Sequence, residues 1–204
     1  MELSVKPIML EKERYYKLNL KKNCLIVLFL ILINNESFAS PKDKIINNLK
    51  KIENLSFSFE QKIENNIETG NCIIQYPKLL YCIYNNKDKK EMISNGNSLV
   101  IKNNRYNKTY RYPLNKTPLE KILDKKFLIS KIRNLKPIKN NRKLLEFSFS
   151  DEKNLLLIFF DNKNFDIAGW KTIDVYQKEV IFKISDLKKN LIINKKKFVL
   201  PKSN

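Results

Sequence analysis

The sequence predicts a mainly β protein with a few helices, of the α+β class. Apolar and polar residues alternate with a period of two through several segments, beginning with Leu55–Glu60, and this period is typical of β-strands. Strong helix-start signals stand at only two places, Ser40-Pro41 and Thr117-Pro118. We therefore expect about nine to eleven strands, one helix before them and one or two helices in the middle.

Residues 1–39 have the pattern of a secretory signal peptide. Lys21 and Lys22 precede an apolar run of ten residues, Cys24 to Ile33, and Ser37 and Ala39 form a small-x-small cleavage site. The run is shorter than the roughly 20 residues that a membrane span needs. We expect export with cleavage after Ala39, the alternative being an uncleaved anchor.

The remaining residues, 40–204, are expected to form a single domain. Of the 40 basic and 21 acidic residues in the chain, 6 and 4 lie in residues 1–39, so residues 40–204 carry 34 and 17, a net charge of +17. Such a charge favours anionic surfaces or partners. A codon bias towards lysine, asparagine and isoleucine explains it equally well.

The first helix is predicted to begin at Pro41, with the Ser40 hydroxyl as its cap. Ile45, Ile46, Leu49 and Ile52 form one apolar stripe along it, so one face of this basic helix should lie on the core. The alternating strand LSFSFEQKIE follows directly.

The next segment, GNCIIQYPKLLYCIY at residues 70–84, reads as two short strands around Pro77. If the strands fold back there, Cys72 faces Cys82. Opposed β-carbons lie about 4.5–5.5 Å apart, whereas a disulfide needs about 3.5–4.5 Å, so only the closer type of pair suits a bridge. An oxidising compartment favours the disulfide; the alternative is two small buried thiols.

Both faces of this hairpin are apolar, although a sheet with one solvated face should alternate. Ile73, Tyr81 and Ile83 lie on the face opposite to the cysteines. We expect either a terminal segment or a partner to cover them.

Further strands and the central helices follow in order. Asn95-Gly96 predicts a hairpin turn, and a strand then reaches residue 113. Thr117, Pro118 and Glu120 predict a hydroxyl cap, a first-position proline and a capping-box acid, and residues 127–135 suggest more helix. Strands are expected again at residues 143–150, 154–161, 165–175 and 179–185, with a short last strand at 197–201.

The composition argues against an enzyme, a metal site and a bound cofactor. The chain has no histidine, which is the commonest general base and metal ligand. Its three glycines do not form a phosphate-binding loop, and its acidic residues are scattered. Export and the alternating, core-like positions of the aromatic residues argue against nucleic acid as the partner of this basic chain.

The order of these features resembles the outer-membrane lipoprotein carrier protein (LolA) family. Phe59 and Gln61 match the Phe-x-Gln at the end of its first strand, and Gly70 to Pro77 match its glycine-led strand running into proline. Ser94-Asn95-Gly96 and Thr117-Pro118 match its turn and its central helix start, and KFVLP is similar to its closing segment. The match extends in order through residues 40–204.

The resemblance implies an incomplete, strongly curved antiparallel β-barrel closed by a helical lid. It implies a monomeric carrier, without covalent chemistry, in the periplasm of a Gram-negative bacterium. The expected partners are lipoprotein acyl chains, an inner-membrane lipoprotein-releasing ABC transporter and an outer-membrane lipoprotein acceptor. The alternative is a basic exported lipid-sensing or adaptor domain that binds anionic partners and has no transport role.

The resemblance also assigns a set of apolar residues to a ligand cavity and its lid. The alternative is that the same residues form an ordinary packed core. The expected lipid-binding cavity consists of Phe57, Phe59, Ile74, Tyr76, Leu80 and Tyr84, with Cys72 and Cys82 on the same face. The expected lid residues are Leu49, Ile52, Leu119, Ile122 and Leu123. Tyr76 stands where the family commonly has an arginine that bonds to the lid. Because a phenol donates only one neutral hydrogen bond, we predict a softer lid.

Overall fold

The computed structural model describes residues 39–201 except 141, 150–154 and 175. The predicted signal peptide therefore lies outside the described residues, apart from Ala39. Within the described ranges, no helix has both the length and the apolar character needed to cross a bilayer.

The described part of the chain forms one antiparallel sheet of eleven strands, in the order β6-β5-β4-β3-β2-β1-β11-β10-β9-β8-β7. The strands are β1 (Asn54–Ile63), β2 (Asn66–Gln75), β3 (Leu79–Tyr84), β4 (Lys90–Asn95), β5 (Ser98–Asn103), β6 (Lys108–Pro113), β7 (Lys139–Asn140), β8 (Leu144–Ser148), β9 (Leu156–Asp161), β10 (Ile167–Ile173) and β11 (Glu179–Lys189).

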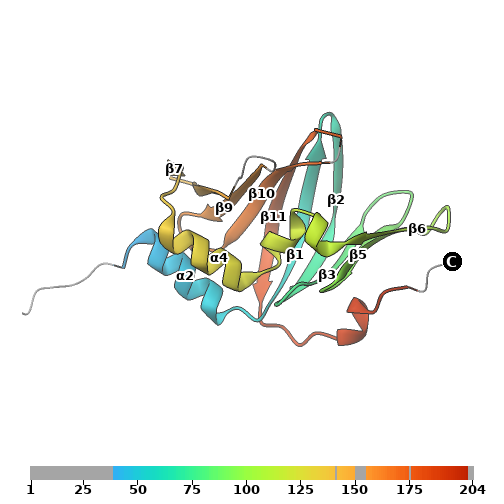
Figure 1. Ribbon diagram of the computed structural model, residues 1–204, viewed down its shortest axis with the longest axis horizontal. Helices are drawn as coiled ribbons and strands as arrows, with labels where there is room; N and C mark the ends of the chain where they lie inside the picture. The colour runs from blue at the N-terminus through green and yellow to red at the C-terminus, as the bar shows by residue number, and fades with distance from the viewer. Residues whose placement is uncertain (1–38, 141, 150–154, 175, 202–204) are drawn as a thin grey trace, which may run out of the picture. The chain divides into compact units, whose positions relative to one another are not determined.

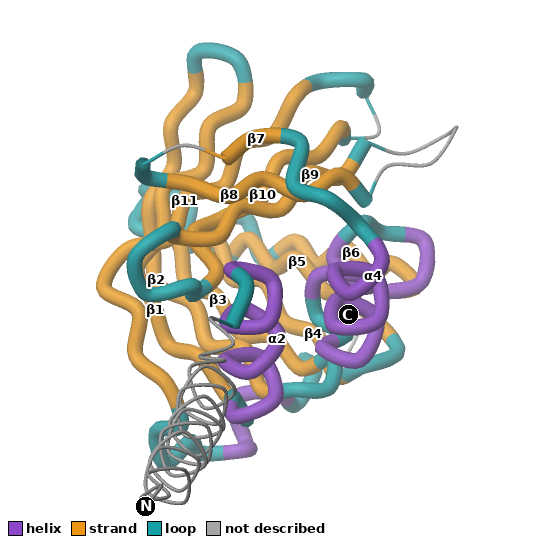
Figure 2. The backbone as a smooth tube through the Cα atoms, turned by 90° about the vertical axis from the view of Figure 1, so that its left-hand side faces the viewer, coloured by secondary structure: helices purple, strands orange, loops and turns teal. Residues whose placement is uncertain are grey.

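The sheet is a meander whose last strand returns to its first. Strands β1 to β6 pair in sequence, and β11 pairs with β1, so both lie in the middle of the sheet. The sheet curves around the helices but does not close, because β6 and β7 form its two free ends (Figures 1 and 2). The predicted incomplete, curved antiparallel barrel is confirmed.

The first helix, α2 (Pro41–Lys51), begins as the sequence predicts. The Ser40 hydroxyl accepts a hydrogen bond from the Asp43 backbone N–H, and the Asp43 carboxylate accepts one from the Ser40 backbone N–H. The hydrogen bond from the Ser40 side chain also lowers the pKa of Asp43. The helix buries Ile45, Ile46 and Leu49 and packs beside α4 (Lys125–Asn134) (Figure 1).

The central helices, η1 (Leu114–Lys116), α3 (Leu119–Ile122) and α4, depart from the predicted capping box. The Thr117 hydroxyl donates to Leu114 O at 2.8 Å and so closes the preceding 3₁₀ turn instead of capping α3. The Glu120 carboxylate binds Lys78, in a turn distant in sequence. The cap that does form belongs to α4, where the Asp124 carboxylate accepts from Phe127 N–H at 3.0 Å.

The predicted last strand at 197–201 is wrong, because the chain forms a 3₁₀ helix, η2 (Lys195–Phe198), in this region. Asn194 caps it, accepting from Lys196 N–H at 3.0 Å. The helix packs on β3 and β4: Phe198 is buried, and Lys197 Nζ lies 5.1 Å from the Tyr81 ring centroid. A terminal segment therefore covers part of the second apolar face of the hairpin, while Ile83 stays 42% exposed.

Candidate functional site

A cavity of about 490 Å³ lies between the sheet and the segment from η1 to α3. Its volume falls within the roughly 300–1,000 Å³ of typical ligand pockets. Most of its lining is apolar. The lining residues are Gln61, Ile63, Cys72, Ile74, Leu80, Cys82, Tyr84, Met92, Leu99, Ile101, Tyr112, Lys116, Thr117, Pro118, Leu119, Leu123, Leu155, Trp170, Thr172, Ile173, Asp174, Gln177, Val180 and Phe182.

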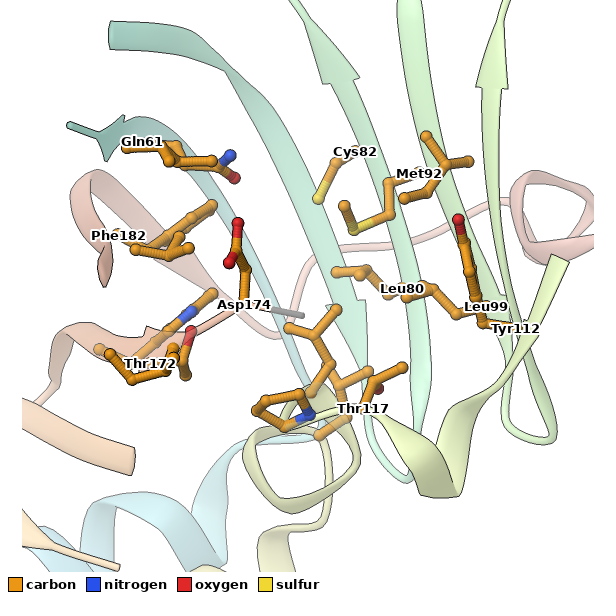
Figure 3. A pocket seen from close by; sticks show the side chains of 18 of the residues that line it. Gln61, Leu80, Cys82, Met92, Leu99, Tyr112, Thr117, Thr172, Asp174 and Phe182 are labelled. Carbon is orange, nitrogen blue, oxygen red and sulfur yellow. The ribbon is translucent and has the colours of Figure 1, made fainter. Parts of the chain in front are cut away.

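The cavity has two walls that come from opposite halves of the sheet. Leu80, Cys82 and Leu99 project from β3 and β5, and they face Phe182 and Thr172 on β11 and β10 (Figure 3). Because the sheet curves, strands that are distant in its order lie across from one another. The cavity therefore depends on the curvature of the whole sheet, and the hairpin of β2 and β3 supplies only part of one wall.

A row of packed aromatic rings connects the two walls, with Phe59 behind the cavity lining. The rings of Trp170 and Phe182 stack with centroids 4.1 Å apart, Phe182 and Phe59 stack at 4.7 Å, and Phe59 meets Tyr84 edge-on at 4.9 Å. Gly70 makes this arrangement possible, because a β-carbon there would lie 2.7 Å from the Phe59 ring and 2.1 Å from Ile83 O. The missing side chain lets Phe59 extend over β2 to Tyr84.

The predicted pairing of the hairpin is confirmed, and its two cysteines are joined. Cys72 is directly opposite Cys82, with Ile74 opposite Leu80, and a disulfide links the cysteines across Cα atoms 4.1 Å apart. The disulfide lies in the cavity wall. It ties β2 to β3 at the centre of the lining.

A polar network supports one end of the cavity. The Tyr84 hydroxyl donates to Gln61 Oε1 at 3.0 Å, and Lys90, which forms an ion pair with Glu68, places its Nζ 3.9 Å from the Tyr84 ring centroid. Burial, together with the nearby Glu68 charge, raises the pKa of Tyr84 above its ordinary value. The phenol therefore stays neutral, and its hydrogen bond offsets the cost of burying it.

The turn of the hairpin holds the central helical segment, residues 114–134, against the sheet. Lys78 N–H donates to Leu123 O at 2.9 Å, and Lys78 Nζ lies 2.9 Å from Glu120 and 3.8 Å from Asp124. The hydrogen bond with Glu120 raises the pKa of Lys78. The buried Ser94 hydroxyl fixes the turn from the other side by donating to Lys78 O at 2.8 Å.

A second set of contacts ties α4 to the first helix. Lys125 Nζ donates to Ile52 O at the end of α2. Lys42 Nζ donates to Arg133 O and Leu135 O, both at 3.1 Å, where the last carbonyls of α4 have no partners within the helix. Lysine side chains therefore connect the central helical segment to the β2–β3 turn near its start and to α2 along α4.

We predict that Lys78→Met loosens the central helical segment slightly. The variant keeps the backbone bond to Leu123 and removes only the ion pairs, which are about one-third exposed. Such pairs contribute about 0.2–1 kcal/mol, so amide hydrogen exchange in residues 119–134 should accelerate up to about fivefold, and less at high salt. Lys183→Met, which removes an outer-face pair with Glu60 at 2.9 Å, is the control. Equal acceleration in both variants would contradict the prediction.

The structure brings only part of the predicted site to the cavity. Ile74, Leu80, Tyr84, Leu119 and Leu123 line it. The other predicted residues are buried in the core without lining it: Phe57, Phe59, Tyr76, Leu49, Ile52 and Ile122. Phe59 packs against Phe182 and Tyr84, and those two rings form the surface in its place. Helix α2 packs on α4, so its stripe fills the core and not the cavity.

Sequence reasoning missed the wall that comes from the C-terminal strands. Trp170, Phe182 and Val180 were recognised only as strand residues. Their alternation was a usable signal for an inward face, but the pairing of β11 with β1, which brings them to the cavity, was not visible in the sequence.

Tyr76, which stands where the family commonly has an arginine that bonds to the lid, makes no side-chain hydrogen bond to the central helical segment. Its side chain is 8% exposed, and its hydroxyl has no hydrogen-bond partner in the described part of the chain. Burial raises the pKa of this phenol. Lys125 Nζ lies 5.8 Å from its ring centroid, so the side chain is enclosed beside α4. Lys78, two residues further on, makes the polar contacts that were assigned to this position.

Besides its apolar residues, the cavity lining contains a disulfide, two phenols, two amides and two threonine hydroxyls, and its charged residues are Lys116 and Asp174. No group of three or more histidine, cysteine, aspartate or glutamate residues that could hold a metal ion occurs within the described ranges. The geometry suits a long apolar ligand.

Comparison with known proteins places these features in a family. The family model described as "Outer membrane lipoprotein carrier protein LolA" matches residues 50–201. An outer-membrane lipoprotein carrier protein from Francisella philomiragia is 28% identical over 198 residues, covering 81% of this chain and 95% of that protein.

Solved structures with a similar fold are more distant in sequence. A LolA superfamily protein from Nitrosomonas europaea is 10% identical with a TM-score of 0.41, covering 79% of this chain and 99% of that one. MucB in the Pseudomonas aeruginosa MucA/MucB complex is 8% identical with a TM-score of 0.43, covering 79% of this chain and 61% of that one.

Proposed function

This chain belongs to the outer membrane lipoprotein carrier protein (LolA) family, and we propose that it carries lipoproteins across the periplasm. In this proposal the cavity binds the acyl chains, and the central helical segment acts as the lid. The observation that carries the proposal is the apolar cavity of about 490 Å³ beneath that segment in a chain of this family.

The physical need for such a carrier follows from the acyl chain itself. Each methylene resists transfer to water by about 0.8 kcal/mol, so a chain of about 15 methylenes resists it by roughly 12 kcal/mol. A carrier in water must offer an apolar surface of comparable strength. The stacked rings and aliphatic walls of the cavity supply surface of this kind.

Release of the lipoprotein requires that the apolar contacts between the cavity and the acyl chain can be weakened. The central segment borders the cavity through Leu119 and Leu123, and its polar contacts to Lys78 are partly exposed. Ligand and lid side chains compete for the same apolar surface in this proposal. The exposed ion pairs add little to lid closure, so closure depends mainly on buried apolar side chains such as Ile122 and Leu123, whose contacts an acyl chain can replace in part.

The proposed partners are an inner-membrane lipoprotein-releasing ABC transporter and an outer-membrane lipoprotein acceptor. The family and the carrier from Francisella philomiragia support a periplasmic location. The net charge of +17 on residues 40–204 favours acidic docking faces on these partners, so added salt should weaken the contacts. The carrier performs no covalent chemistry in this proposal.

Native mass spectrometry of the protein purified from expressing cells tests the proposal. Co-purification of acylated lipoprotein is expected, and depletion of the protein should leave outer-membrane lipoproteins in the inner membrane. Correct lipoprotein sorting after depletion would instead favour a lipid-sensing or adaptor domain.

We predict that Ile101→Trp weakens acyl-chain binding. Ile101 lines the cavity from β5 and is only half-buried, so an indole there fills ligand space without overpacking the core. Displacing roughly two methylenes should cost about 1.6 kcal/mol, or roughly fifteenfold in affinity. Binding of a fluorescent fatty acid gives the measurement. Ile83→Trp, on the opposite face of β3, is the control and should bind like the wild type.

A further inference from the structure

The C-terminal part of the chain concentrates positive charge. Asp186 is the last acidic residue, and six lysines follow it. Lys189 pairs with Asp166, but Lys195, Lys196 and Lys197 are exposed, and no carboxylate of the described residues lies within ion-pair distance of them. The red segment below β3 and β5 in Figure 1 carries these three lysines.

Aliphatic side chains project from the same segment. Ile192 is fully exposed, Val199 is 69% exposed and Leu191 is 43% exposed. Scattered exposed aliphatic residues are ordinary on protein surfaces. These three are distinguished by lying within nine residues that also contain three consecutive lysines without a carboxylate partner among the described residues.

The backbone of this segment is held at both ends. Asn54 exchanges two hydrogen bonds with Leu191, at 2.9 and 3.0 Å, and Asn190 Nδ2 donates to Lys51 O at 2.9 Å. At the other end Phe198 is buried. The lysines and aliphatic tips are therefore displayed by an ordered segment.

We propose that residues 190–199 dock the protein reversibly on a bilayer that contains anionic phospholipid. A basic cluster supplies attraction to the lipid head groups, each lysine near such a surface strengthening binding by about fivefold. The exposed aliphatic side chains add a second, apolar contribution, because they can insert at the boundary between the head groups and the acyl chains. An acidic protein surface would use the lysines but would leave fully exposed Ile192 without a role.

The docking surface is separate from the cavity. Helix η2 packs on β3 and β4 beside Tyr81, whose side chain points to the face opposite to the cavity-lining Leu80 and Cys82. Docking there leaves the cavity and the central helical segment free. The inference therefore stands independently of the proposed lipoprotein transport.

Vesicle flotation of the protein purified from the soluble fraction of expressing cells tests the inference. The probes are phosphatidylcholine vesicles with and without phosphatidylglycerol. The variants are the triple substitution Lys195→Gln, Lys196→Gln and Lys197→Gln, and the single substitution Ile192→Ser. A matched control substitutes Lys50 on α2, Lys108 on β6 and Lys163 in the turn after β9 by Gln, which removes the same charge from exposed sites elsewhere.

Wild-type protein should float only with phosphatidylglycerol vesicles and less at high salt. The 195–197 triple variant should lose about a hundredfold in affinity, and Ile192→Ser about tenfold, while the control triple stays within a few-fold of wild type. Equal losses in both triple variants would overturn the proposal in favour of attraction by net charge. No flotation of the wild type at low salt would overturn it in favour of an acidic protein partner.

Discussion

Gly70→Ala is expected to lower the free energy of unfolding by about 3 kcal/mol, because overpacking a filled site is strongly destabilising. The added β-carbon would lie 2.1 Å from Ile83 O, a backbone atom fixed in the β2–β3 pairing, and 2.7 Å from the Phe59 ring. A flexible side chain could move aside, but a strand carbonyl cannot do so without separating two strands. Urea denaturation monitored by tyrosine and tryptophan fluorescence gives the measurement.

Two further variants separate the effect of the Gly70 collisions from the effect of any substitution in β2. Asn71→Ala changes the adjacent exposed position of β2 and should cost well under about 1 kcal/mol. Phe59→Leu in the Gly70→Ala background relieves the ring collision but not the carbonyl one, so it should recover only part of the loss. A loss for Gly70→Ala as small as that for Asn71→Ala would show that β2 and β3 separate easily at this point.

Local patterns predicted most of the elements and the pairing of the Cys72–Cys82 hairpin. The Ser40-Pro41 start, the alternation of Leu55, Phe57 and Phe59, and the opposition of Cys72 and Cys82 all appear in the structure as expected. These features depend on residues close in sequence, where side-chain period and cap chemistry decide the conformation. The curvature was predicted only from the family resemblance; the family match confirms the resemblance, and the structure shows the open, curved sheet.

The features that were missed depend on contacts between distant segments. Glu120 was expected to cap its own helix, but Lys78 lies within 2.9 Å and offers a charged partner. KFVLP was expected to be a strand, yet Phe198 becomes buried against the outer face of β3 and β4. The wall that includes Trp170 and Phe182 reaches the cavity only because β11 returns to β1. No local pattern encodes these contacts.

Tyr76→Phe is expected to stabilise the form with the central helical segment closed. The Tyr76 hydroxyl is buried without a hydrogen-bond partner among the described residues. Leaving a buried donor unpaired costs about 1–3 kcal/mol. Opening the segment would let water reach the hydroxyl, so the cost applies mainly to the closed form. Removing the oxygen should then favour closure by about fivefold to a hundredfold.

The expected readouts for Tyr76→Phe are higher stability in urea, slower hydrogen exchange in residues 119–134 and weaker fatty-acid uptake. Tyr84→Phe is the matched control, because the Tyr84 hydroxyl does have a partner, Gln61 at 3.0 Å. Losing that bond should destabilise the protein by about 1 kcal/mol. If Tyr76→Phe raises the free energy of unfolding and Tyr84→Phe lowers it, the unpaired Tyr76 hydroxyl destabilises the closed form. Destabilisation by Tyr76→Phe would mean that its hydroxyl is bonded in the closed form after all.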